Sequence, residues 1–148
     1  MMRRRLVLTL PPLPPPTRLY HLAPIGVGTP HVESLTGYLQ RLAEAHHVST
    51  SDLVSGELLP VLQPGGLGGK PVATWLSQEG PHLNGTGAMA GEAARALALL
   101  TGRQELLCLT LQPWTAVIAA YGLVRIRKHS RRWCDACYRD ALEQGTPV

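Results

Sequence analysis

Apolar residues recur at helical spacing along most of this chain, and almost no segment alternates with the period of two that marks a half-buried strand. The clearest rhythm is Leu35, Tyr38, Leu39 and Leu42, which follows a Ser34 suited to capping a helix. The pattern therefore predicts a mainly α fold. We expect helices over about 34–46, 50–59 and 89–100, one or two turns over 71–78, a helix C-cap at Gly102, a short helix or turn over 104–114 and another helix over 115–123.

Residues 42–53, LAEAHHVSTSDL, carry the pattern of an N-terminal helix-turn-helix. This motif needs a small residue in the first helix, a tight turn, an apolar residue after the turn and a polar cap at the start of the second helix. These places are filled in order by Ala43, His46 and His47, Val48, and Ser49, Thr50 and Ser51. In a DNA-binding protein, Ser49, Thr50 and Ser51 would contact the groove or the phosphates.

Two features depart from that motif. His47 stands in the turn where glycine is usual, and histidine tolerates left-handed geometry less freely than glycine. The second helix also has no Arg, Lys, Asn or Gln to read base edges. An ordinary helical hairpin, used for packing or for contact with another protein, therefore stays open beside DNA binding.

Basic residues are concentrated in two places, although the formal net charge of the 148-residue chain is only +4. The first cluster is Arg3, Arg4 and Arg5. The second consists of Arg125, Arg127, Lys128, Arg131, Arg132 and Arg139. Such clusters suit phosphate backbones or acidic protein surfaces, and a solubilising face is the alternative. The short apolar run before the first prolines fits neither an export signal nor a membrane span, so we expect a cytoplasmic protein without membrane contact.

Proline-rich and glycine-rich stretches suggest how the chain is divided. Residues 64–71, PGGLGGKP, depart from a phosphate-binding loop because prolines stand at positions 64 and 71, so we interpret them as a linker. The expected regions are a Pro-rich disordered or extended lead (1–30), a helix-turn-helix (31–62), a Gly-rich linker (63–72), a helical module (73–128) and half of a zinc knuckle (129–148).

The stretch RRWCDACYRD contains Cys134 and Cys137, whose spacing suits one half of a tetrahedral zinc site. A thioredoxin-like redox pair would need a βαβ context, which the sequence lacks. His129 is near enough to be a third ligand, whereas Cys108 lies in an apolar run where we expect a buried, structural cysteine. We expect the other separate histidines, His21, His31 and His82, to lie in loops.

The sequence shows no nucleophile set or paired carboxylates in apolar surroundings, and we expect no enzymatic activity. The enzymatic alternative is a small redox or metal-dependent enzyme that uses the cysteine pair.

Three ordered stretches over residues 20–143 resemble the TniQ family of transposition targeting proteins, which includes TnsD. They are PHVESLTGYLQRLAEAHHVSTSDL, LTGRQELLCLTL and RRWCDACYRDA. Members typically continue past the first cysteine pair to a Cys-x-x-His that completes the zinc site, whereas this chain stops at Val148. The resemblance thus implies zinc at Cys134 and Cys137, with the site left empty if the second ligand pair is missing, in a short or truncated member.

The same resemblance implies a non-enzymatic adaptor in transposition target selection. Such an adaptor links a target-recognition element, either DNA or a CRISPR effector complex, to a TnsC-type AAA+ ATPase. The helix-turn-helix and the run from Arg125 to Arg132 would then contact DNA or a partner. A general helix-turn-helix DNA-binding regulator is the alternative function.

Overall fold

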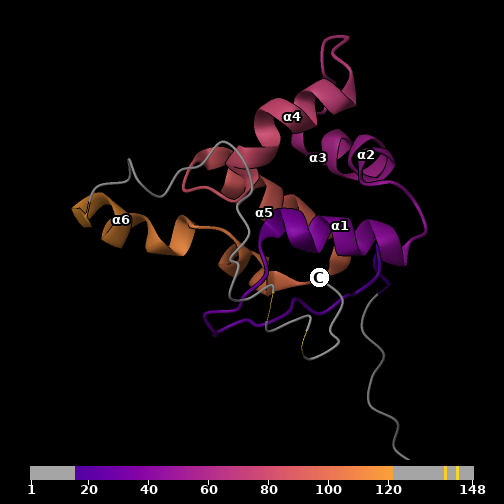
Figure 1. Cartoon of the computed structure of the whole chain (residues 1–148). Coiled ribbons are helices and arrows are strands. Elements are labelled where there is room, and N and C mark those ends of the chain that lie inside the picture. The colour runs from indigo at the N-terminus through magenta and orange to yellow at the C-terminus, as the bar shows by residue number, and fades with distance from the viewer. Residues whose placement is uncertain (1–15, 122–138, 140–142, 144–148) are drawn as a thin grey trace, which may run out of the picture.

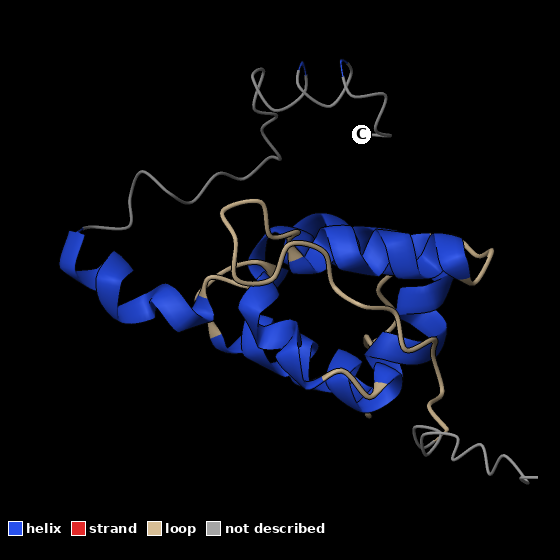
Figure 2. Cartoon of the chain, turned by 90° about the horizontal axis from the view of Figure 1, so that it is seen from below, coloured by secondary structure: helices blue, strands red, loops and turns tan. Residues whose placement is uncertain are grey.

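The computed structural model describes residues 16–121, together with Arg139 and Glu143. The regular structure within these residues is entirely helical, with no strand (Figure 1), and Figure 2 shows how the helices stack around a common interior. The predicted mainly α fold is therefore confirmed. The elements are α1 (Leu35–Ala45), α2 (Thr50–Leu53), the π-helical η1 (Val54–Leu58), α3 (Leu59–Leu62), α4 (Val72–Leu83), α5 (Ala88–Thr101), the 3-10 helices η2 (Gln104–Leu109) and η3 (Gln112–Trp114), and α6 (Thr115–Tyr121).

Helix α1 forms where the periodicity predicted it. The Ser34 hydroxyl caps its first turn by accepting a hydrogen bond from the Gly37 amide at 3.1 Å. Leu35, Tyr38 and Leu42 are fully buried, as their spacing on one helical face requires.

The second helical run is longer than predicted. It continues through α2, η1 and α3 to Leu62 instead of ending near Gly56 or Pro60. Pro60 has no amide hydrogen and would clash with a regular preceding turn. The π turn widens the helix immediately before it, with the Leu59 amide bonded five residues back to the Val54 carbonyl, and this accommodates the prolyl ring.

Helix α4 is also longer than the one or two turns expected, because burial at both of its ends outweighs its internal Pro81. Trp75 and Leu83 are buried on one face, and His82 lies in the last helical turn, so its assignment to a loop was wrong. Asn84 caps α4 and ties it to α1, since its Oδ1 accepts the Thr36 amide and its Nδ2 donates to the Thr36 hydroxyl, at 3.0 and 2.9 Å.

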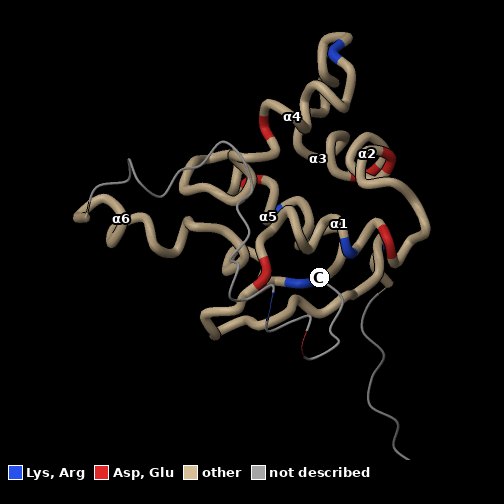
Figure 3. The backbone as a smooth tube through the Cα atoms, in the orientation of Figure 1, with Lys and Arg blue, Asp and Glu red and all other residues tan. Residues whose placement is uncertain are grey.

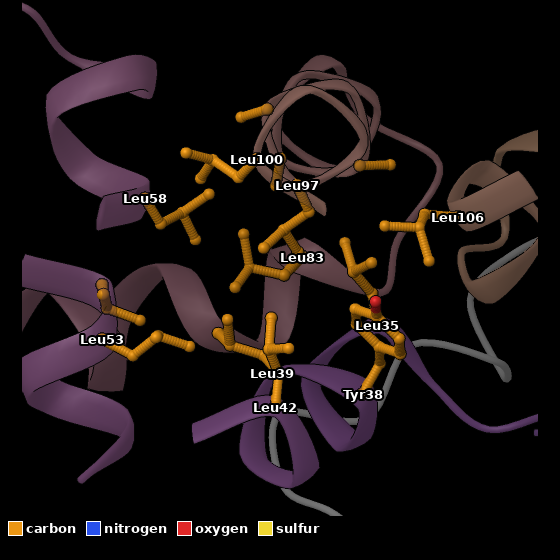
Figure 4. Packing of buried hydrophobic residues seen from close by; sticks show 14 of the residues in the cluster. Leu35, Tyr38, Leu39, Leu42, Leu53, Leu58, Leu83, Leu97, Leu100 and Leu106 are labelled. Atoms are coloured by element: carbon orange, nitrogen blue, oxygen red, sulfur yellow. The ribbon is translucent and has the colours of Figure 1, made fainter. Parts of the chain in front are cut away.

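Helix α5 is the central element of the core. Its alanines let neighbouring helices approach closely, and it contacts α4, α3, η1 and η2. Leu97 and Leu100 point into the same interior as Leu58 and Leu83 (Figure 4). Gly102 ends α5 in the left-handed conformation, with φ +73°, which confirms the predicted cap. Because the core joins α1–α3 to α4–α5, residues 63–71 form a loop between helices that share one core.

The second half of the N-terminal lead is packed against the helices rather than loose. Residues 16–30 are irregular, but Leu19 is buried and its amide donates to the Leu100 carbonyl at 2.8 Å. The Tyr38 hydroxyl donates to the Leu22 carbonyl at 2.9 Å. This half of the lead, expected to be disordered or extended, is therefore an irregular segment held against the helices.

Cys108 is exposed, so its predicted burial was also wrong. The physical reason is the 3-10 geometry of η2, which repeats every three residues. Leu106 and Leu109 share the buried face, while Leu107 and Cys108 lie on the outer side.

Candidate partner-binding helix pair

The turn between α1 and α2 is tight and depends on one left-handed residue. His47 has φ +56° and is the one non-glycine residue with positive φ among those the structure describes. The Val48 amide then donates back to the Ala43 carbonyl at 3.0 Å, which closes the turn over the end of α1. His47 thus takes the conformation that glycine usually supplies at such a turn.

Ser49 starts the second helix, as predicted. Its hydroxyl accepts the Asp52 amide at 3.0 Å and donates to the Asp52 carboxylate at 2.6 Å. Thr50 and Ser51 are half-buried, and their hydroxyls make no hydrogen bond within the described residues. Of the three predicted site residues, Ser49 therefore caps the helix, and the hydroxyls of Thr50 and Ser51 have no hydrogen-bond partner among the described residues.

The two helices pack through Ala43 and Leu42 on α1 and through Leu53 and Val54 on the second run, all of which are buried. Val48, the apolar residue after the turn, is instead 43% exposed. The turn therefore presents an apolar side chain to its surroundings, next to the hydroxyls of Thr50 and Ser51.

Tyr20 supports the turn from the lead, and no sequence signal indicated this contact. Its ring stacks on His46 with centroids 4.0 Å apart, and its amide donates to His46 Nε2 at 3.0 Å. His46 must carry no proton on Nε2 to accept this bond. The turn is thereby fixed on one side by the lead and on the other by the core.

Basic side chains are absent from the second helical run. Between residues 42 and 62 the charged residues are Glu44, Asp52 and Glu57, and Figure 3 shows no Lys or Arg along α2 and α3. The whole stretch 16–121 has five Lys and Arg against seven Asp and Glu, a formal net charge of −2 with neutral histidines. The described helices are thus slightly acidic, and the excess of basic residues lies elsewhere in the sequence.

Three of those five cations are also paired with carboxylates. Arg41 Nη2 lies 2.6 Å from a Glu33 oxygen and donates to the Ala23 carbonyl at 2.8 Å. Arg18 pairs with Glu57, and Arg103 lies 3.3 Å from Glu105. Lys70 and Arg95 remain, which is few cations for a phosphate-binding surface.

The remaining predicted site residues lie outside the described residues. They are Arg125, Arg127, Lys128, Arg131, Arg132, Cys134 and Cys137. The expected zinc site is among them, and within the described residues no group of three His, Cys, Asp or Glu side chains is placed to hold a metal. Zinc at the cysteine pair stays a prediction.

The family model named TniQ matches residues 24–146, which is most of the chain and includes the helix pair. The chain belongs to the TniQ family. Membership indicates a transposition-related targeting protein, in a family whose domain is not catalytic. A search of curated proteins gives no significant match. Among the described residues, no helix of this TniQ-family chain is long and apolar enough to cross a membrane.

Proposed function

We propose that the chain is a non-enzymatic adaptor that links a target-recognition element, DNA or a CRISPR effector complex, to a TnsC-type AAA+ ATPase. In this proposal the α1–α2 turn is a helix-turn-helix used for protein contact. The observation that carries the proposal is the absence of Lys and Arg from residues 42–62, in a chain whose family acts in transposition targeting. Val48, Thr50 and Ser51 form the proposed contact, here called the turn surface.

The start of the second helix is a poor place for a DNA phosphate. Helix N-termini attract anions because their first amides are unpaired and the helix dipole is positive there. Here Asp52 already supplies a negative charge in the first turn, bonded to the Ser49 cap. A phosphate would meet this carboxylate, and no cation on the run would offset the repulsion. A neutral or basic protein surface would not be repelled by the Asp52 carboxylate.

Any DNA contact is proposed instead for the basic run, Arg125, Arg127, Lys128, Arg131 and Arg132. Five cations within eight residues can each displace a condensed counterion, which makes binding strongly salt-dependent. Cys134 and Cys137 follow this run directly, and they remain the proposed zinc ligands if two further ligands are supplied.

The alternative function is a helix-turn-helix DNA-binding regulator. The tight turn and the Ser49 cap are compatible with it. It requires the second helix to enter the major groove, where this helix would present Asp52 and Glu57 and no residue suited to guanine or adenine. Tight binding of the isolated protein to one operator sequence would favour the regulator.

The experiment is co-sedimentation with ATP-bound TnsC-type filaments on DNA, comparing Val48→Ser with Val61→Ser. Both valines are about equally exposed, at 43% and 40%, but Val61 lies about 16 Å further along the helical run. Val48→Ser should weaken binding by about fivefold or more, as truncation of an interface anchor does. Val61→Ser should bind as the unmodified protein does. Equal binding by both variants would reject the turn surface as the contact.

A further inference from the structure

The apolar residue of the turn surface, Val48, lies between two exposed acidic residues. Glu44 precedes it in the last turn of α1, and Asp52 follows it in α2. Among the exposed large apolar side chains of the described residues, Val48 alone has an acidic residue within four positions on both sides. Figure 3 shows acidic residues on both helices that meet at this turn. The turn surface therefore has an acidic border, Glu44 and Asp52, which distinguishes it from the other exposed apolar positions in residues 16–121.

Neither carboxylate of the acidic border is neutralised within the part of the chain that the structure describes. Glu44 accepts a hydrogen bond from the Gln40 side chain at 3.2 Å, and Asp52 accepts one from the Ser49 hydroxyl at 2.6 Å. Both donors are uncharged, and neither carboxylate forms an ion pair among the described residues. Arg41, the nearest cation in the sequence, is paired with a different carboxylate. Both negative charges therefore remain available to a partner.

Helix stability does not account for Glu44. The C-terminal end of a helix carries a partial negative charge, so a carboxylate in the last turn lowers helix stability and a cation raises it. Helix α1 has no basic residue in its last turn and has Glu44 there instead. A charge that costs stability and has no ion-pair partner among the described residues is of the kind that proteins keep for function.

The turn holds the acidic border and Val48 in fixed positions. His47 sets the backbone with its left-handed conformation, and the Tyr20 ring stacks on His46 beside it. The bond from the Ser49 hydroxyl orients the Asp52 carboxylate. Because the surface is already ordered, a partner loses little free energy in ordering it on binding.

We propose that the partner segment bound by the turn surface is cationic, with Lys or Arg beside an aliphatic or aromatic side chain. The apolar side chain contacts Val48, and the cations face Glu44 and Asp52. This inference rests on the proposed function, because it specifies the chemistry of the protein that the turn surface binds. A DNA phosphate would be repelled by the same two charges. Charges at the border of a contact speed association and select the partner.

Charge reversal at Glu44 tests this inference in the co-sedimentation assay with ATP-bound TnsC-type filaments on DNA. Glu92→Lys is the matched control, because Glu92 is exposed on α5 and forms no ion pair among the described residues. Both substitutions change the net charge equally, so any added attraction to DNA is the same. Glu44→Lys should bind about tenfold more weakly than Glu92→Lys, and Glu44→Gln about threefold more weakly than the unmodified chain. Raising the salt to about 200 mM should narrow both differences, because exposed charges are screened.

Melting temperature separates this effect from misfolding. Glu44→Lys should raise it by about 2 °C, since it places a cation at the end of α1. Equal filament binding by Glu44→Lys and Glu92→Lys overturns the inference, and if Val48→Ser still weakens binding, the proposed function stands without it. Failure of the unmodified chain to bind filaments overturns both. Self-association of the chain that Glu44→Lys abolishes would assign the surface to a second copy and would also overturn the inference.

Discussion

Replacing Leu97 by alanine should destabilise α1 and α5 together, because the two helices share one core. Leu97 is 1% exposed in the middle of α5, and the same cluster of buried side chains includes Leu39 and Leu42 on α1. If residues 31–62 and 73–128 folded separately, the substitution would affect only the second.

The size of the expected destabilisation follows from the burial of the Leu97 side chain. Leu97→Ala removes a fully buried isobutyl group and leaves a cavity that the surrounding helices fill only in part, which costs about 3 kcal/mol. For a helical unit of this size the loss corresponds to a melting temperature lower by about 10 °C or more. Leu99→Ala is the matched control, because Leu99 lies on the same helix and is 75% exposed, so its truncation should change stability by less than about 0.5 kcal/mol.

The assay is hydrogen exchange under native conditions, followed for peptides from α1 and from α5. In the Leu97→Ala protein both peptides should lose protection by the same factor, since global unfolding exposes them together. Unchanged protection in α1 would refute the shared core. An equal effect of Leu99→Ala would refute the assignment of the buried face.

Three further predictions concern the turn, the buried tyrosine and the metal. His47→Val should lower the unfolding free energy by about 1–2 kcal/mol, because a β-branched residue fits φ +56° poorly, while His47→Gly should not; chemical denaturation measures both. Burial raises the pKa of Tyr38, so the stability that its protonated hydroxyl contributes is present below about pH 10 and is lost as the pH rises further. Tyr38→Phe should therefore flatten the decline of melting temperature above pH 10, whereas Tyr121→Phe, at an exposed site, should not. EDTA should leave the melting temperature unchanged, because the main hydrophobic cluster among the described residues is built from residues 19–109; a large decrease would show that metal holds the helices together.

Local signals in the sequence were enough to predict the helices whose ends and faces they define. The Ser34 cap with its leucine spacing gave α1, and the Ala-rich run before Gly102 gave α5. In both helices the capping residue and the apolar period indicate the same helix, and the packing in the fold agrees with these local signals.

The sequence could not reveal features that depend on distant contacts. The extent of α4 past Pro81 depends on the burial of Leu83, and the packing of Leu19 depends on the α5 carbonyl that its amide meets. The exposure of Cys108 depends on whether its segment repeats every 3.0 or 3.6 residues, which an apolar run does not specify. The first two of these features depend on tertiary contacts, and the third depends on a local helical repeat that the apolar run leaves open.

The backbone geometry of the candidate site could be predicted from the sequence, but the ion pairs of the arginines among the described residues could not. The tight turn and the Ser49 cap could be predicted from the sequence, and so could the lack of base-reading residues, whereas His47 was a departure from the motif whose left-handed conformation only the structure shows. That Arg18 and Arg41 are occupied by carboxylates could be seen only in the fold. In the proposed function, these pairs and Asp52 at the helix start favour a protein partner over DNA.

The most direct test of the adaptor proposal compares two affinities of the folded chain over rising salt, one for ATP-bound TnsC-type filaments on DNA and one for the same DNA without filaments. The proposal predicts tighter binding to the filaments, with an advantage that persists at about 200 mM salt, where loss of counterion release weakens binding to bare DNA. Equal affinity for both, declining with the same salt slope, would contradict it.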